Sequence, residues 1–271
     1  MTETQKPVFV PDRLAIYVAF ALLTLAGVSW LASYYLMPLM MASGSGAMSM
    51  GVASIVSSLS FSSIGFFEIV WVIGMAAMMF PAMIPIVLFY NKVATKQESN
   101  PLRARVIGTP LFLSGYLIMY AVLGLGAYLA VYESINLSMN FSALAALSVL
   151  ASGAILIVTG IYQFTPMKSR CLSNCVSPMG FFAVHLQKGL VGTIRMGLKN
   201  GLYCVGCCWA FMLVMLAVGA MSIPVMAALA GMIAVEKVIV RGAVWFNRLV
   251  AVGFIGLGVA VLLFPRILVF I

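Results

Sequence analysis

Long runs of apolar residues dominate this sequence and restrict the folds that the chain can adopt. A helix needs about 20 apolar residues to cross the roughly 30 Å hydrocarbon core of a bilayer. Seven runs approach that length: 14–37, 66–90, 107–131, 141–164, 201–220, 222–240 and 249–264. Because 64% of the residues are hydrophobic and only 8% are charged, the sequence predicts an all-α polytopic membrane bundle of about seven transmembrane helices.

The apolar runs follow one another without a polar domain between them. Residues 1–271 are therefore expected to form a single transmembrane domain. The first run is longer than the apolar part of a signal peptide, which favours a transmembrane helix. Within 14–65, this helix is followed by a methionine-rich loop that carries glycine and serine but no charge.

The basic residues predict the orientation in the membrane, because Lys and Arg collect in cytoplasmic loops. With a cytoplasmic N-terminus, all the basic residues except Arg266 fall on the cytoplasmic side: Lys6, Arg13, Lys92, Lys96, Arg103, Arg105, Lys168, Arg170, Lys188, Arg195, Lys199, Lys237, Arg241 and Arg248. The net charge of +9 is then a topology signal and requires no nucleic-acid partner.

The cysteines occur in two short stretches, RCLSNC and GLYCVGCCWA. They are Cys171, Cys175, Cys204, Cys207 and Cys208. Helix positions i, i+3 and i+4 share a face, so the thiols of each stretch can converge. The topology places all of them near the reducing cytosol, which favours a metal site over a disulfide. The alternative is that some of them pack as small hydrophobic side chains.

Charged residues accompany these thiols. Basic neighbours would favour the thiolate form, and they are Lys168, Arg170, Arg195 and Lys199. Glu68 and Glu236 lie inside apolar runs near an interface, where a carboxylate is functional, is paired or extends to the membrane surface. The partners expected for Glu236 are Lys199, Arg241 or Arg248. We expect a structural role for the single histidine, His185, on a short interfacial helix with Phe181 and Phe182.

Methionines extend the pattern of sulfur ligands across the predicted bilayer. Met75, Met79 and Met83 recur every four residues and form one thioether stripe, with Met78 beside it. Thioethers are soft ligands that suit Cu(I). Further candidates are Met212 and Met215 beyond the cysteines, and, for capture at the outer surface, Met37, Met40, Met41, Met48 and Met50. Met is also a common filler of membrane helices, which is the alternative interpretation.

Four stretches together resemble a prokaryotic membrane family, domain of unknown function 2182, described as metal-binding integral membrane proteins. They are GMAAMMFPAMIP at 74–85, GIYQFTPMKSRCLSNCVSP at 160–178, GLKNGLYCVGCCWAFM at 197–212 and EK at 236–237. The resemblance covers about 66–264. It implies a multi-helix fold in a prokaryotic cytoplasmic (inner) membrane and a metal site. This site would be carried by the five cysteines and by Ala77 to Pro81.

We expect a protein that acquires or transports Cu(I) through the methionine stripe to the cysteine cluster. Copper is the expected metal and zinc the alternative. The expected partners are lipids, other membrane subunits or a metallochaperone. Two other interpretations remain open. The protein is an accessory subunit that holds a metal or simply packs within a larger membrane complex, or it is a membrane thiol oxidoreductase. The sequence contains no nucleotide-binding or hydrolase motif, so an enzyme is not expected.

Overall fold

The computed structural model describes residues 13–42, 56, 60–97, 106–140, 142–219 and 223–264. Every regular element within these ranges is a helix, and no strand occurs among them. The all-α prediction is therefore confirmed for this part of the chain.

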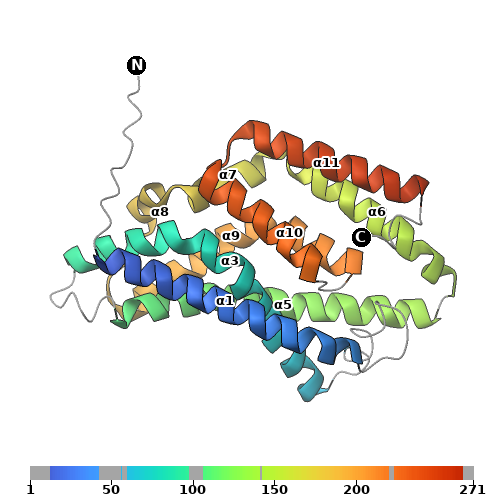
Figure 1. Cartoon of the computed structure of the whole chain (residues 1–271), viewed down its shortest axis with the longest axis horizontal. Coiled ribbons are helices and arrows are strands. Elements are labelled where there is room, and N and C mark those ends of the chain that lie inside the picture. Colours follow the sequence, from blue (N-terminus) through green and yellow to red (C-terminus); the bar gives the residue numbers. More distant parts are fainter. Residues whose placement is uncertain are drawn as a thin grey trace.

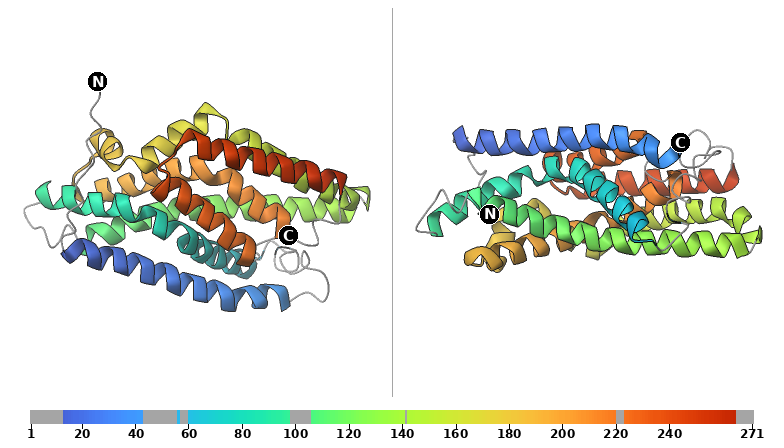
Figure 2. Two further views of the ribbon diagram at one scale, coloured as in Figure 1. Left: turned by 45° about the horizontal axis from the view of Figure 1, so that its top comes forward. Right: turned by 90° about the horizontal axis from the view of Figure 1, so that it is seen from below.

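The long helices lie alongside one another, as the three views in Figures 1 and 2 show. The elements are α1 (Arg13–Ala42), α3 (Phe61–Gln97), α5 (Gly108–Asn140), α6 (Ser142–Tyr162), α7 (Pro166–Val176), α8 (Pro178–His185), α9 (Gly189–Gly219), α10 (Ile223–Ala234), the π-helical turn η1 (Val235–Ile239) and α11 (Val244–Leu263). This parallel arrangement suits the bilayer, in which each helix satisfies its own backbone hydrogen bonds.

Five helical segments in the described ranges are long and apolar enough to cross a membrane: Ile16–Leu36, Phe61–Val93, Gly108–Asn136, Gly189–Leu216 and Val244–Leu263. A sixth is possible if Leu150–Tyr162 and Pro166–Val176, which meet at a bend of 67°, together form one broken span. The multi-pass membrane prediction is supported. The count of seven is not confirmed, because the described residues contain five candidate spans, or six with the bent pair. In the run 222–240, α10 ends at Ala234 and the π-helical turn η1 follows at the next residue.

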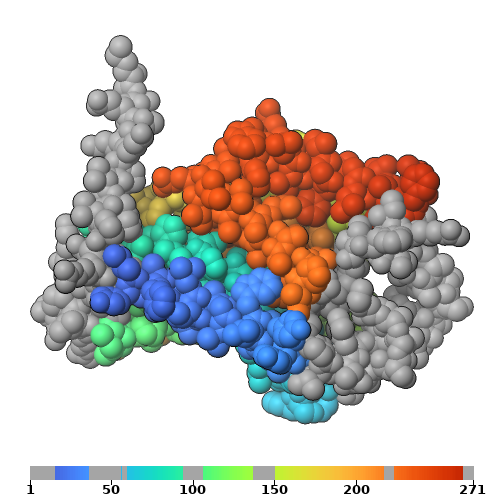
Figure 3. All heavy atoms as spheres, viewed as in Figure 1, coloured from blue at the N-terminus to red at the C-terminus, as the bar shows by residue number. Residues whose placement is uncertain are grey.

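Burial separates a central helix from peripheral ones. In the most apolar stretch of each candidate span, 61% of α3 is buried inside the protein, against 17% of α1 and 28% of α11. Figure 3 shows α1, α10 and α11 on one face of the molecule. Large apolar side chains such as Tyr17, Phe20, Leu249 and Val252 are exposed on α1 and α11. Apolar surface of this extent is typical of a protein that faces lipid.

Small residues allow α5 and α9 to approach closely. A Cβ atom on Gly197 of α9 would overlap the backbone carbonyl of Phe112 on α5, and one on Gly115 would overlap the carbonyl of Ile194. The two helices therefore pack backbone against backbone, as small residues permit in membranes. This contact positions the middle of α9, where three cysteines lie.

The short helix α8 differs from the interfacial helix that we expected. Phe181 and Phe182 are buried at 0% and 2% exposure, and Phe182 packs against Phe89 of α3. His185 stacks on Phe181, and its Nδ1 lies 3.1 Å from the Phe181 carbonyl oxygen. The phenylalanines thus face the protein interior, because α3 offers aromatic partners. The contacts of His185 suit the expected structural role.

Candidate metal centre

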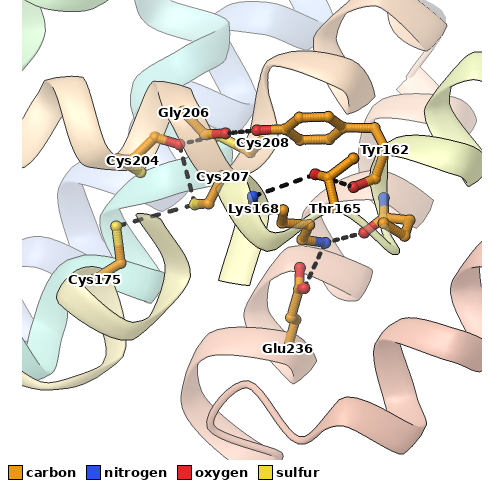
Figure 4. A network of polar contacts seen from close by, with 10 residues as sticks. Tyr162, Thr165, Lys168, Cys175, Cys204, Gly206, Cys207, Cys208 and Glu236 are labelled. Atoms are coloured by element: carbon orange, nitrogen blue, oxygen red, sulfur yellow. Dashed lines mark hydrogen bonds and ion pairs between the residues drawn. The ribbon is translucent and has the colours of Figure 1, made fainter. Parts of the chain in front are cut away.

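Three cysteine thiols from two helices come together at one point. Cys204 and Cys207 project from α9 and Cys175 from α7, and their Sγ atoms all lie within 4.8 Å of one another. The Sγ atoms of Cys175 and Cys207 are 3.9 Å apart. Figure 4 shows Cys175 directed across to Cys207. We call Cys175, Cys204 and Cys207 the thiol centre.

The bend between α6 and α7 brings Cys175 to this position. Pro166 begins α7, and the Thr165 side chain caps the helix by accepting a hydrogen bond of 3.4 Å from the Lys168 backbone N–H. Proline in the first turn with a threonine N-cap is a common way to start a helix. The chain turns by 67° at this break. As a result, α7 packs against α9 instead of continuing α6.

The other two cysteines lie outside the thiol centre. The Cys208 Sγ donates to the Cys204 carbonyl oxygen at 2.7 Å. Cys171 is half-buried, and its Sγ would lie 2.7 Å from a Cβ atom on Gly206. The structure thus assembles three of the five predicted ligands, and the metal-binding role of all five stays a prediction.

Polar groups surround the sulfur of Cys204. The Lys237 ammonium group donates to this Sγ at 2.8 Å, and the hydroxyl groups of Tyr116 and Tyr120 each lie 3.1 Å from it. All three side chains are buried. A buried ammonium and a thiolate form a charge-assisted hydrogen bond, which suits a sulfur that acts as an anionic ligand. Lys237 therefore places positive charge against the thiol centre.

Sequence reasoning missed these three contacts. Lys237 was counted only as a cytoplasmic charge, although the EK stretch belongs to the family resemblance. Tyr116 and Tyr120 lie one turn apart on α5 and carry no signal that distinguishes them from other membrane tyrosines. Of the basic residues expected to act on the thiols, Lys168 instead faces Glu236.

Glu236 and Lys168 form a buried ion pair. The Lys168 Nζ lies 2.5 Å from the Glu236 Oε1, and the two side chains are 1% and 3% exposed. Lys168 also donates to the Gln163 side-chain carbonyl and lies 4.9 Å from the centre of the Phe211 ring. The partner of Glu236 is therefore on α7 and is none of the three that we expected. The bend at residues 163–165 brings α7 close to η1.

The turn η1 contacts two helices through consecutive residues. Glu236 pairs with Lys168 of α7, and Lys237 donates to Cys204 of α9. π-Helical turns are rare and often occur at functional sites. Here the turn holds α7 and α9, which carry the thiol centre, through two polar contacts. Both the ion pair and the thiols are visible in Figure 4.

The methionines of the predicted path all point into the protein. Each is 3% exposed or less: Met75, Met78, Met79, Met83, Met212 and Met215. They are therefore not lipid-facing filler, although conduction of an ion along them stays a prediction. Met37, Met40 and Met41 belong to α1 instead of a loop, because the helix continues to Ala42. Their side chains, and Met48 and Met50 entirely, lie outside the described residues.

A comparison with models of protein families identifies the family of the chain. No curated protein and no solved structure matches it. A family model, PpoB2, described as a copper chaperone, matches residues 68–261. These bounds agree closely with the 66–264 of the resemblance, although the match does not carry the name domain of unknown function 2182. Because the matched residues make up more than half of the 271-residue sequence, the chain belongs to the PpoB2 copper-chaperone family.

Proposed function

We propose that this protein binds Cu(I) at the thiol centre and passes the ion to an acceptor protein. The observation that carries the proposal is the convergence of three Sγ atoms within 4.8 Å in a member of a copper-chaperone family. Thiolates are soft ligands and select Cu(I). The metal is the cargo of the protein, and the centre is its holding site.

The geometry favours Cu(I) over Zn(II). A structural zinc site is closed by four ligands in a tetrahedron. The thiol centre supplies three thiols among the described residues, and the group nearest to the Cys204 sulfur besides them is the ammonium of Lys237, which cannot bind a metal. A monovalent ion with a low coordination number suits this set better than a divalent ion that needs a fourth ligand.

The route that we propose runs inward through the membrane. The buried methionines Met75, Met79 and Met83 would carry Cu(I) along α3, and the cysteines would receive it near the cytoplasmic face. Thiolates are anionic and bind Cu(I) more tightly than neutral thioethers, so the ion moves from weaker to stronger ligands. We place the protein in the cytoplasmic membrane of a prokaryote with its N-terminus inside. The acceptor is then a metallochaperone or a membrane subunit.

The test compares matched cysteine variants of the full-length protein, purified in detergent under reducing conditions. Cu(I) is titrated without oxygen against a competing chelator. The C204S/C207S variant should lose the tightly bound Cu(I). The control C171S/C208S makes the same chemical change outside the thiol centre and should retain it. Equal loss in both variants would refute a three-thiol centre. Full binding in both would refute the cysteines as ligands.

One observation also favours a second candidate, a membrane thiol oxidoreductase. Cys175 and Cys207 have sulfur atoms 3.9 Å apart, close enough to form a disulfide after a small movement. This function predicts electron exchange with a quinone or a dithiol protein in the absence of copper. Copper-free protein that is inert toward both would exclude it. An accessory subunit, by contrast, would co-purify with a larger membrane complex.

A further inference from the structure

A small cavity lies among four helices of the bundle, apart from the thiol centre. Its volume is about 10 Å³, close to the space that one water-sized sphere needs. It is lined by Ser33 of α1, by Val70, Trp71, Gly74 and Met75 of α3, by Met215 of α9 and by Met226 of α10. Residues from four separate helices thus line one small space.

Three of the lining side chains are methionines from three different helices. Met75, Met215 and Met226 are 1%, 2% and 2% exposed. Met226 packs directly against Gly74, because the position that a Cβ atom there would take is 3.7 Å from the Met226 methyl carbon, an ordinary van der Waals distance. The helical repeat along α3 does not predict this cluster, because Met226 belongs to α10. The result is a thioether-lined space of atomic size.

The cavity also contains a buried hydroxyl group. Ser33 is 1% exposed, and its Oγ has no hydrogen-bond partner in the described part of the chain. Buried hydroxyl groups are nearly always hydrogen-bonded, often to a carbonyl of their own helix, because an unsatisfied one is costly. Ser33 therefore offers an oxygen lone pair to an occupant of the cavity.

An acidic side chain of α3 lies beside Trp71, one of the residues that line the cavity. Both carboxylate oxygens of Glu68 are buried, and neither has a hydrogen-bond partner among the described residues. The Glu68 Oε2 and the Trp71 indole both lie within 3 Å of the position that a Cβ atom on Gly124 would take. Trp71 in turn lines the cavity. A cation in the cavity would thus have a carboxylate nearby as its counter-charge.

The cavity and the thiol centre are connected through the protein. The Trp71 indole N–H donates to the Tyr120 carbonyl at 3.0 Å, and the Tyr120 hydroxyl donates to the Cys204 Sγ at 3.1 Å. Along α9, Met215 follows Cys207 of the thiol centre by a little more than two helical turns, roughly 12 Å at about 1.5 Å per residue. The two groups of sulfur atoms are therefore linked by one stretch of α9.

We propose that Met75, Met215 and Met226 form a second Cu(I) site, in which Ser33 supplies an oxygen ligand and Glu68 the counter-charge. The proposal rests on the proposed function for the identity of the ion and for its destination. In this arrangement the thioether site holds Cu(I) weakly within the bundle, and the thiol centre takes it up because thiolates bind more strongly. The neutral thioethers make the ion easy to release.

The test counts bound Cu(I) in the full-length protein, with Ag(I) as a redox-inert second probe. The wild type should bind two equivalents, one tight and one weak. The variant M75L/M215L/M226L keeps volume and apolarity and should lose only the weak equivalent. The variant C175S/C204S/C207S should lose only the tight one, and its X-ray absorption spectrum should show thioether sulfur around copper. The control M119L/M232L removes two methionines that do not line the cavity and should bind as the wild type does.

The outcomes separate the two proposals. If the wild type binds only the tight equivalent, and M75L/M215L/M226L retains it, the thioether site is refuted and the thiol centre is not. If M75L/M215L/M226L still binds the weak equivalent, the thioether site is also refuted. A further test adds a ligand and removes none. S33C in the C175S/C204S/C207S background places a soft thiol at the cavity and should raise the Ag(I) affinity at least about tenfold, or about 1.4 kcal/mol. Unchanged affinity would show that Ser33 does not contact the ion and would contradict the proposed site.

Discussion

The buried ion pair between Lys168 and Glu236 offers a quantitative test of how the thiol centre is held. The two side chains are 1% and 3% exposed, and their charged atoms lie 2.5 Å apart. Replacing Lys168 by Met leaves the Glu236 carboxylate buried without its cation. Loss of one partner of a buried pair costs about 3–5 kcal/mol. We expect K168M to lower the free energy of unfolding by about that amount.

Replacing Glu236 by Met should reduce the free energy of unfolding less than K168M does, and replacing both residues should reduce it least. In E236M, Lys168 retains the Gln163 side-chain carbonyl and the ring of Phe211. In K168M/E236M no buried charge of this pair remains, and apolar replacement of a buried pair is often neutral or stabilising. The double variant should therefore be more stable than K168M alone, with a coupling energy of about 2 kcal/mol or more between the sites.

The assay is equilibrium unfolding in mixed detergent micelles, with R170M as the control. Arg170 is exposed on the same helix, so its replacement should change the stability by no more than about 0.5 kcal/mol. Because Lys168 and Cys175 share α7, K168M should also weaken Cu(I) binding while R170M should not. If the losses of the two single variants simply add in the double variant, the pair does not couple η1 to α7, and the argument fails.

Three further predictions concern the thiols, the packing and the topology. Mild oxidation should join Cys175 to Cys207, remove two titratable thiols and abolish tight Cu(I) binding until a reductant is added; retention of all five thiols would contradict this. G197A should destabilise the protein by about 1–3 kcal/mol because its Cβ overlaps a carbonyl of α5, whereas G256A, with open space around it, should change stability by less than about 0.5 kcal/mol; equal effects would refute the close contact. L190C should react with a membrane-impermeant thiol reagent only from the cytoplasmic side, and labelling from outside would invert the topology.

The helices could be predicted because apolar length alone decides whether a segment can cross a bilayer. Backbone groups in lipid must be satisfied within each segment, so a long apolar run has few alternatives to a helix. The run 222–240 shows where this reasoning ends. Its apolarity is sufficient for a span, but Glu236 and Lys237 have tertiary partners, and the helix changes there from α to π. Hydropathy does not register such partners.

The thiol centre was predictable only where the ligands share a helix. The spacing of Cys204 and Cys207 places both on one side of α9, and the structure shows them together. Cys175 joins them because the chain bends by 67° between α6 and α7, whereas Cys171 on the same helix lies outside the group. The direction of a bend depends on packing between helices. The spacing of residues within α7 does not contain that information.

The partners of the two charged residues in η1, Glu236 and Lys237, also depend on how the helices pack. Consecutive Glu and Lys residues near the end of an apolar run predict pairing with neighbours or exposure at the interface. Glu236 is indeed paired, but Glu236 and Lys237 contact different helices, because successive side chains on a helix point in different directions and both α7 and α9 lie within reach. Glu236 neutralises Lys168, so the charge of Lys237 remains for Cys204. The positive charge at the thiol centre therefore depends on an ion pair that contains none of its ligands. For this reason, we expect the loss of Lys168 to weaken Cu(I) binding at the thiol centre.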